Sequence, residues 1–316
     1  MSDQAYAFGV DIGGTSVKMG LFSTQKGLLE KWQLPSRADG DSAAMLAEIA
    51  GSLQKYAAAN GLRRADILGA GVGAPGPVDE RGVVYGCVNL GWGTVALKDA
   101  LEALCGFNIR AENDANAAAL GERWRGAAKG CDSMVLLTLG TGVGGAVILG
   151  GALLRGAHGC AGEVGHIGVC SDEVTPCNCG ARGCLEQYAS ASGLVRLAKE
   201  AAASGEKTAL PSDGLTAELI FAAARAGDAA ALLAVDRMAE RLGRALASIA
   251  AVCDPQVFVI GGGLSRAGEL LRAAVARHYR RMAFGGMVNT PIKIAALQND
   301  AGIWGAASLL LAGFWD

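Results

Sequence analysis

The sequence predicts an α/β fold built from two similar halves, and three observations support this prediction. The chain has 316 residues, enough for about two domains. Short apolar runs alternate with longer stretches of helical periodicity, as in α/β proteins. Both halves open with a strand, a Gly-Thr turn and a second strand, around residues 11–15 and 139–143. This internal repetition predicts a duplicated fold with a cleft between the halves.

The individual elements follow from hydrophobic periodicity and from turn residues. Helices are predicted at 42–60, with Ser42 as N-cap, and at 113–125, 228–252, 266–282 and 303–314. Residues 155–185 are rich in Gly, Cys and His and are predicted to be irregular. Strands are predicted at 6–10, 17–22, 28–34, 67–74, 107–112, 134–139, 144–149, 257–260 and 292–296, the runs at 134–139 and 144–149 forming a hairpin.

Composition excludes several classes of protein. Hydrophobic residues make up 51% and charged residues 18% of the chain, which is too apolar for intrinsic disorder. The net charge of −2 gives no reason to expect nucleic acid or an anionic membrane as a partner. The stretch from Ser133 to Leu154 is uncharged for 22 residues, but six glycines favour a hairpin over a membrane helix. With no signal peptide recognisable, a soluble cytoplasmic protein is expected.

The two Gly-Thr turns are candidates for binding nucleotide phosphates. Glycines let successive backbone N–H groups point at a phosphate, and threonine adds a hydroxyl donor. A carboxylate at the start of the turn suits hydrated Mg²⁺. The spacing matches neither a P-loop nor a Rossmann fingerprint, and tight turns without a ligand are the alternative. The residues concerned are Asp11, Gly13, Gly14, Thr15 and Lys18 in the first half, and Gly140, Thr141 and Gly142 in the second.

A third glycine-rich segment, Gly261-Gly262-Gly263, follows a predicted strand and precedes a predicted helix. A backbone without side chains permits close packing of a flat ligand such as adenine. A plain loop before a helix is the alternative interpretation.

Asp114 is the candidate catalytic carboxylate. It lies with Asn113 at a predicted strand-to-helix junction, where the helix dipole helps to keep an exposed carboxylate ionised. Phosphoryl transfer to an alcohol needs a carboxylate placed against the hydroxyl, and Asn113 could orient the substrate. The alternative is that Asn113 or Asp114 merely caps the helix.

His166, Cys177, Cys179 and Cys184 have the spacing of a structural zinc site. One imidazole and three thiolates make a closed tetrahedral Zn²⁺ site without an open position for chemistry. Cys170 is a rival ligand, and free thiols in a loop are the alternative. Glu163 and Glu186 flank the cluster, and carboxylates beside an imidazole suit a polyhydroxylated ligand such as a sugar.

Taken together, these motifs resemble the ROK family of bacterial sugar kinases, and within it the glucokinases. The resemblance covers nearly the whole chain, and the Cys-x-Cys-Gly-x-x-Gly-Cys-x-Glu run is its most specific part. The matching segments, in family order, are Asp11-Ile-Gly-Gly-Thr15, Gly73-Ala-Pro-Gly-Pro-Val-Asp79, Asn89-Leu-Gly-Trp92, Glu112-Asn-Asp-Ala-Asn-Ala-Ala-Ala-Leu-Gly-Glu122, Gly140-Thr-Gly-Val-Gly-Gly145, Gly162-Glu-Val-Gly-His166 and Cys177-Asn-Cys-Gly-Ala-Arg-Gly-Cys-Leu-Glu186.

The resemblance implies an actin-like ATPase (ribonuclease H-like) fold with two lobes around a central cleft. Residues 1–113 plus 304–316 would form the smaller lobe, and 114–303 the larger lobe with the zinc loop at about 166–184. ATP phosphates would bind the two Gly-Thr turns with Mg²⁺ between them, and Asp114 would be the general base. The implied sugar contacts are Asn89, Asn113, Asp114, Glu163, His166 and Glu186.

The resemblance also implies the function: ATP-dependent phosphorylation of glucose at its 6-hydroxyl, by a homo-oligomer that is a dimer or tetramer. Alternative substrates are N-acetylmannosamine, N-acetylglucosamine, fructose and allose, and a sugar sensor without catalysis is the alternative from another class. Repressors of the family carry an N-terminal helix-turn-helix extension. Here the first phosphate turn begins at Asp11, so DNA binding is not expected.

Overall fold

The computed structural model describes residues 5–37 and 39–311, and its chain divides into two units. The first unit contains residues 1–130, 155–160 and 299–316, and the second contains 131–154 and 161–298. These bounds differ from the expected lobes, 1–113 plus 304–316 and 114–303. Helix α3 (Asp114–Arg125) belongs to the first unit because it packs closely against α9 (Ala301–Leu311).

The first unit is built on a five-stranded sheet in the order β3-β2-β1-β4-β7. β1 (Tyr6–Ile12), β2 (Ser16–Ser23) and β3 (Gly27–Pro35) form an antiparallel meander. β4 (Ile67–Ala74) and β7 (Ile109–Asn113) run parallel to β1. The predicted strands in this unit are therefore confirmed.

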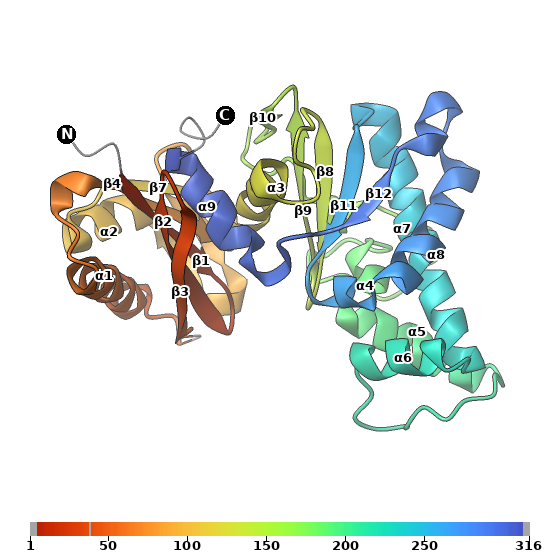
Figure 1. Ribbon diagram of the computed structural model, residues 1–316. Helices are drawn as coiled ribbons and strands as arrows, with labels where there is room; N and C mark the ends of the chain where they lie inside the picture. The colour runs from red at the N-terminus through yellow and green to blue at the C-terminus, as the bar shows by residue number, and fades with distance from the viewer. Residues whose placement is uncertain (1–4, 38, 312–316) are drawn as a thin grey trace. The chain divides into compact units, whose positions relative to one another are not determined.

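The two faces of this sheet are covered by different helices (Figure 1). Phe8, Val10 and Ile12 share a core with α1 (Ser42–Ala59) and α2 (Leu97–Cys105). On the opposite face, a Cβ at Gly9 would collide with the carbonyl oxygen of Ile303, and one at Gly71 with that of Ala306. Glycine at both positions therefore lets α9 lie directly on β1 and β4.

Two details of the first unit differ from the sequence prediction. The N-cap of α1 is Asp41 and not Ser42, because the Asp41 carboxylate accepts a hydrogen bond from the Ala44 amide at 2.9 Å. A short hairpin of β5 (Val84–Cys87) and β6 (Trp92–Val95) was not predicted. Its connection is a 3₁₀ turn at Val88–Leu90, which carries Asn89.

The second unit repeats the architecture of the first. Its sheet has the order β10-β9-β8-β11-β12, with the same pattern of antiparallel and parallel neighbours. The strands are β8 (Met134–Leu139), β9 (Val143–Leu149), β10 (Ala152–Leu153), β11 (Val257–Gly261) and β12 (Ile292–Ile294). The predicted duplication and the predicted hairpin are both confirmed.

Helices pack on the second sheet around Val135 and Leu137 of β8. The predicted helix at 266–282 begins only at Glu269, because residues 263–267 form a 3₁₀ turn and Gly268 has a φ of +63°. Within the described residues, no helix is both long and apolar enough to cross a membrane. The helices of this unit are α4 (Glu186–Ala189), α5 (Ala191–Ala203), α6 (Ala217–Arg225), α7 (Ala229–Cys253) and α8 (Glu269–Met282).

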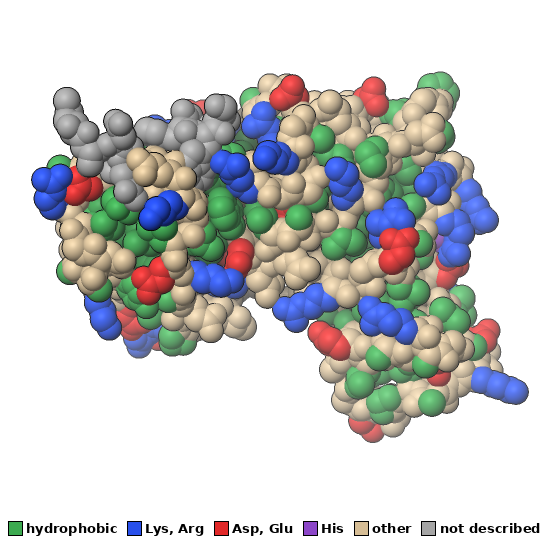
Figure 2. Space-filling view, in the orientation of Figure 1, with side chains coloured by type: hydrophobic (Ala, Val, Ile, Leu, Met, Phe, Trp, Pro, Cys, Tyr) green, Lys and Arg blue, Asp and Glu red, His purple; other side chains and the backbone are tan. Residues whose placement is uncertain are grey.

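The face of the molecule in Figure 2 carries acidic and basic side chains together over both units. This mixture agrees with the net charge of −2, from 28 basic and 30 acidic residues.

Candidate functional site

The first unit gathers its candidate residues at the carboxyl ends of three parallel strands. Asp11 of β1 pairs in register with Gly73 of β4, and Gly73 pairs with Glu112 of β7. The first Gly-Thr turn and the start of α3 therefore lie at the same edge of the sheet. Ligands of open α/β sheets bind at this edge.

Asp11 lies in a largely buried position at the start of the first turn. Its side chain is 16% exposed, and Lys18 Nζ lies 3.5 Å from one carboxylate oxygen. The carboxylate packs directly on Gly302 of α9, where any Cβ would collide with it. Burial raises the pKa of Asp11, and the charge of Lys18 opposes this shift. At the tip of the turn, Gly14 and Thr15 are exposed and open to a ligand.

Asn113 caps α3, as the alternative interpretation of this segment proposed. Its Oδ1 accepts hydrogen bonds from the amides of Ala115 and Asn116 at 3.0 and 3.1 Å. Its Nδ2 donates to the carbonyl oxygen of Gly76 at 3.0 Å. Asn113 therefore has one amide hydrogen left for a substrate.

Asp114 is the first residue of α3 and is half-buried, although the sequence predicted an exposed carboxylate. The reason is that α3 is not a surface helix, since it packs against α9 along its length. The Asp114 Oδ1 accepts a hydrogen bond from the Ala115 amide at 2.8 Å. This bond holds the carboxylate at the helix N-terminus, where the dipole favours its charged form.

Asn89 lies next to the first turn on the short hairpin of the first unit. A Cβ at Gly14 would be 3.8 Å from the Cβ of Asn89, and the Asn89 side chain is exposed. Cys87 of the same hairpin is buried, which raises the pKa of its thiol, and the charge of Asp114 adds to this shift. The hairpin therefore lies close to both the Gly-Thr turn and Asp114.

The second unit contains the predicted metal cluster. The ligand atoms of His166, Cys177, Cys179 and Cys184 all lie within 4.8 Å of one another. The Sγ atoms of Cys179 and Cys184 are 3.7 Å apart, and His166 Nδ1 lies 4.0 Å from Cys177 Sγ. Zinc–sulfur bonds of about 2.3 Å in a tetrahedron place two sulfurs about 3.8 Å apart, so the cluster fits zinc.

The thiols of the cluster differ in their surroundings. Burial, together with the neighbouring thiols, raises the pKa of Cys184 to about 12, whereas a hydrogen bond from the Ala181 backbone lowers the pKa of Cys179. Cys170, the rival ligand, lies outside the cluster. With Nδ1 of His166 facing the cluster, its Nε2 remains available for another partner.

Glu186 connects the loop that carries the predicted metal ligands, residues 166–184 (the metal loop), to the second Gly-Thr turn. Its Oε2 accepts a hydrogen bond from the Val143 amide at 3.0 Å, and a Cβ at Gly142 would collide with that oxygen. The carbonyl oxygen of Gly140 accepts a bond from the Ala191 amide at 2.8 Å. The turn is therefore held from two sides by residues that follow the cysteines.

The glycine-rich segment at 261–263 lies beside this turn. Gly262 has a φ of +79°, and a Cβ there would collide with the backbone of Leu139, the residue before Gly140. Gly261 closes β11, while Gly263 has open space around it. The structure thus brings together the second turn and the segment predicted to pack against a base.

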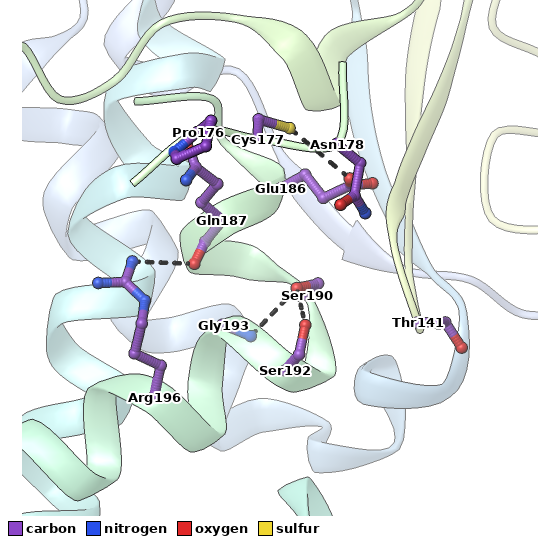
Figure 3. Close-up of a pocket in the computed structure, with 10 residues that line it drawn as sticks. All are labelled: Thr141, Pro176, Cys177, Asn178, Glu186, Gln187, Ser190, Ser192, Gly193 and Arg196. Atoms are coloured by element: carbon purple, nitrogen blue, oxygen red, sulfur yellow. Dashed lines mark hydrogen bonds between the residues drawn. The ribbon is translucent and has the colours of Figure 1, made fainter. Parts of the chain in front are cut away.

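A pocket of about 220 Å³ opens between the second turn and the start of α5 (Figure 3). Thr141 lies on one side, and the hydroxyls of Ser190 and Ser192 lie 3.1 Å apart on the other. Glu186 points into the same region, near Cys177. Glu163, by contrast, is exposed at the start of the 3₁₀ turn Val164–His166 and does not line this pocket.

Comparison with known proteins decides the family. A sequence profile described as "ROK family" matches residues 7–312. The chain belongs to the ROK family. A glucokinase of Halalkalibacterium halodurans is 41% identical to it, over 98% of this chain and 96% of the relative. A glucokinase of Thermotoga maritima is 37% identical, over 96% of each chain.

Solved structures support the same assignment. A ROK family glucokinase from Streptomyces griseus, in complex with glucose and AMPPNP, matches with a TM-score of 0.82 and 37% identity. The match covers 98% of this chain and 100% of that chain. The prediction of an actin-like ATPase fold for this ROK protein is therefore confirmed.

Two residues near Asp114 were not predicted as site residues from the sequence. Glu112, a member of the 112–122 motif, is buried and pairs with Arg155. A signal for Arg155 was present, because it is the first charged residue after the uncharged stretch that ends at Leu154.

Proposed function

We propose that this protein is an ATP-dependent glucokinase, a hexokinase-type phosphotransferase that forms glucose 6-phosphate and ADP. The observation that carries the proposal is its similarity, over nearly the full length, to a glucokinase solved with glucose and AMPPNP. The position of the Asp114 carboxylate, half-buried at the N-terminus of α3, gives chemical support to the proposal.

In this mechanism, Asp114 accepts the proton of the sugar 6-hydroxyl while that oxygen attacks the γ-phosphorus of ATP and ADP leaves. The exposed Gly14 and Thr15 of the first turn and the Gly140–Gly142 turn hold the phosphates, and 261–263 accepts the adenine. Mg²⁺ would supply charge neutralisation for the phosphates, held beside Asp11. The proposed sugar contacts are Asn89, Asn113, Asp114, Glu163, His166 and Glu186.

The proposal also includes a structural zinc ion, a homo-oligomeric state and a role in cytoplasmic glycolysis. Zinc at His166, Cys177, Cys179 and Cys184 would order the loop that carries Glu163 and Glu186, and the short distances within the cluster support this. The enzyme would act in the cytoplasm, where ATP is available, as a homodimer or homotetramer. Light scattering of the protein as it elutes from a size-exclusion column measures the oligomeric state.

The decisive experiment is a coupled ADP-release assay with Mg-ATP. The panel contains glucose, fructose, allose, N-acetylmannosamine and N-acetylglucosamine. The highest kcat/KM for glucose is expected. If another sugar is preferred, the assignment as a kinase stands and only the assigned substrate changes. If zinc-replete protein turns over no sugar, a sugar sensor is favoured.

A further inference from the structure

Arg155 pairs with the buried Glu112 next to the proposed base, and the function above does not use this contact. Glu112 is 2% exposed. Its Oε2 accepts hydrogen bonds from Nε and Nη2 of Arg155 at 3.0 and 2.7 Å. Its Oε1 accepts from Nδ2 of Asn116 and from the backbone amide of Asn113, both at 3.0 Å. Both oxygens are thus fully engaged, and Arg155 supplies the positive charge.

Removal of the partner of a buried charge leaves that charge uncompensated, and Glu112 is the buried member of this pair. Without Arg155, the Glu112 carboxylate would lose the two hydrogen bonds on its Oε2 and would be able to turn toward solvent. That rotation would weaken the hydrogen bonds that it accepts on its other oxygen. Arg155 therefore fixes the orientation of Glu112.

Glu112 also anchors the N-terminal helical turn of α3 at two points. It binds the amide of Asn113, the cap of the helix, and the side chain of Asn116, which is 6% exposed. The Asn116 amide also donates to the Asn113 side chain at 3.1 Å. Asp114 lies between these two anchored residues, so a shift of either one moves its backbone.

The position of Arg155 in the chain adds a second connection. The Leu154 amide donates to the Val147 carbonyl oxygen at 2.8 Å within the second unit. Arg155, the next residue, begins the six-residue segment 155–160 that belongs to the first unit. The chain then returns to the second unit at residue 161. The Arg155–Glu112 pair therefore holds this crossing of the chain at the strand end that precedes Asp114.

We infer that Arg155 is a positioning residue for phosphoryl transfer. Through Glu112, Asn113 and Asn116, it sets the place of the Asp114 carboxylate, and this inference rests on the proposed function. A displaced base lowers the rate of the chemical step without removing the groups that bind sugar, because general-base catalysis requires a narrow geometry.

The test begins with Arg155→Met, which removes the donors and the charge but preserves a long side chain. We expect kcat to fall on the order of 10- to 100-fold, with the glucose KM within about threefold of wild type. Arg63→Met is the matched control, because Arg63 donates two bonds to Asp66, at 2.8 and 2.7 Å, on the surface of the same unit. Wild-type kinetics are expected for it.

Chemical rescue separates positioning from a general loss of structure. The rescue is measured in Arg155→Ala, because alanine leaves the space of the missing side chain empty. Arg155 is 45% exposed and lines a pocket of about 480 Å³, so a guanidinium ion can reach that space. Millimolar guanidinium chloride, far below denaturing concentrations, should restore much of kcat in Arg155→Ala. It should restore none in Asp114→Asn, which lacks the base itself.

Two results would overturn the inference: wild-type kcat in Arg155→Met, or a loss of kcat in Arg155→Ala that guanidinium does not reverse. If Arg155→Met does not fold, Arg155→Lys takes its place, and an intermediate kcat with an unchanged KM is expected because lysine retains the charge but not the planar donor pair.

If the wild type phosphorylates no sugar, the proposed function fails, but the positioning role can still be measured. Amide hydrogen exchange at residues 115–118 should then be faster in Arg155→Met than in wild type. Equal exchange in the two proteins would overturn the positioning role.

Discussion

At the scale of single residues, three carboxylates near one sheet edge are set apart by their surroundings. Asp11 is buried against α9, Asp114 is half-buried at a helix N-terminus, and Glu112 is buried with a full set of donors. Environment decides the role of a carboxylate, because burial raises its pKa while donors and cations lower it. The sequence predicted functional roles for Asp11 and Asp114 but could not distinguish these environments.

Asp114→Asn tests the general base. We expect kcat to fall by roughly 10²- to 10⁴-fold, the usual contribution of a positioned base, while glucose still binds. Turnover is measured by ADP release and binding by calorimetry. Asp99→Asn is the matched control, an exposed aspartate in the first turn of α2, and it should leave both unchanged. Near-normal turnover in Asp114→Asn would refute the assignment.

Asp11→Asn tests the cost of the buried carboxylate. Burial raises the pKa of Asp11 above its ordinary value of 3.8, so the native state binds the proton more tightly than the unfolded state. Stability from this group is therefore lost as the pH rises from the ordinary value through the raised one. In urea unfolding, Asp11→Asn should gain free energy of unfolding relative to wild type between acidic and neutral pH. A difference that does not vary with pH would contradict the prediction.

At the scale of elements, the contact of α3 with α9 positions the start of α3. A Cβ at Gly305 would collide with the carbonyl oxygen of Ala117, and one at Gly121 would lie 2.9 Å from the Gly305 amide nitrogen. Glycines on both helices therefore allow their backbones to touch. The sequence predicted both helices but not this crossing, because the two segments are separated by more than half of the chain.

Gly305→Ala should destabilise the protein by about 1–3 kcal/mol or more, because the added methyl group overpacks the crossing. Gly51→Ala is the control, since a Cβ at this exposed position of α1 meets nothing within 4 Å. It should stabilise the protein by about 0.5–1 kcal/mol through helix propensity. Denaturant unfolding measures both changes, and equal effects of the two substitutions would contradict the proposed contact.

The metal loop, residues 166–184, packs Val169 into the hydrophobic core of the second unit and brings the four candidate ligands together. We expect elemental analysis to give about one zinc per chain. Cys179→Ser should lose the metal, lower the Tm and weaken glucose binding, because the loop carries His166 and is flanked by Glu163 and Glu186. Cys170→Ser is the control, outside the cluster, and it should retain the zinc. Zinc-free protein with full sugar affinity would refute the site.

At the scale of the whole molecule, one strand pattern occurs twice. An antiparallel meander is followed by two parallel strands in each unit, and a Gly-Thr turn joins the first two strands of each meander. The backbone between the units crosses at several places, one of them at Arg155. The Arg155–Glu112 pair lies within the first unit, at the point where the chain enters it from the second.

The sequence by itself determined most strands and helices and the duplication, and it predicted the phosphate turns, the metal ligands and the role of Asp114. Hydrophobic periodicity and glycine spacing are local properties, and they can be read without a fold. Only the tertiary structure assigned α3 to the first unit, made Asn113 a cap and placed Arg155 on Glu112. These features depend on contacts between residues that are far apart in the chain, and burial, which sets the pKa of Asp11, exists only once such contacts form.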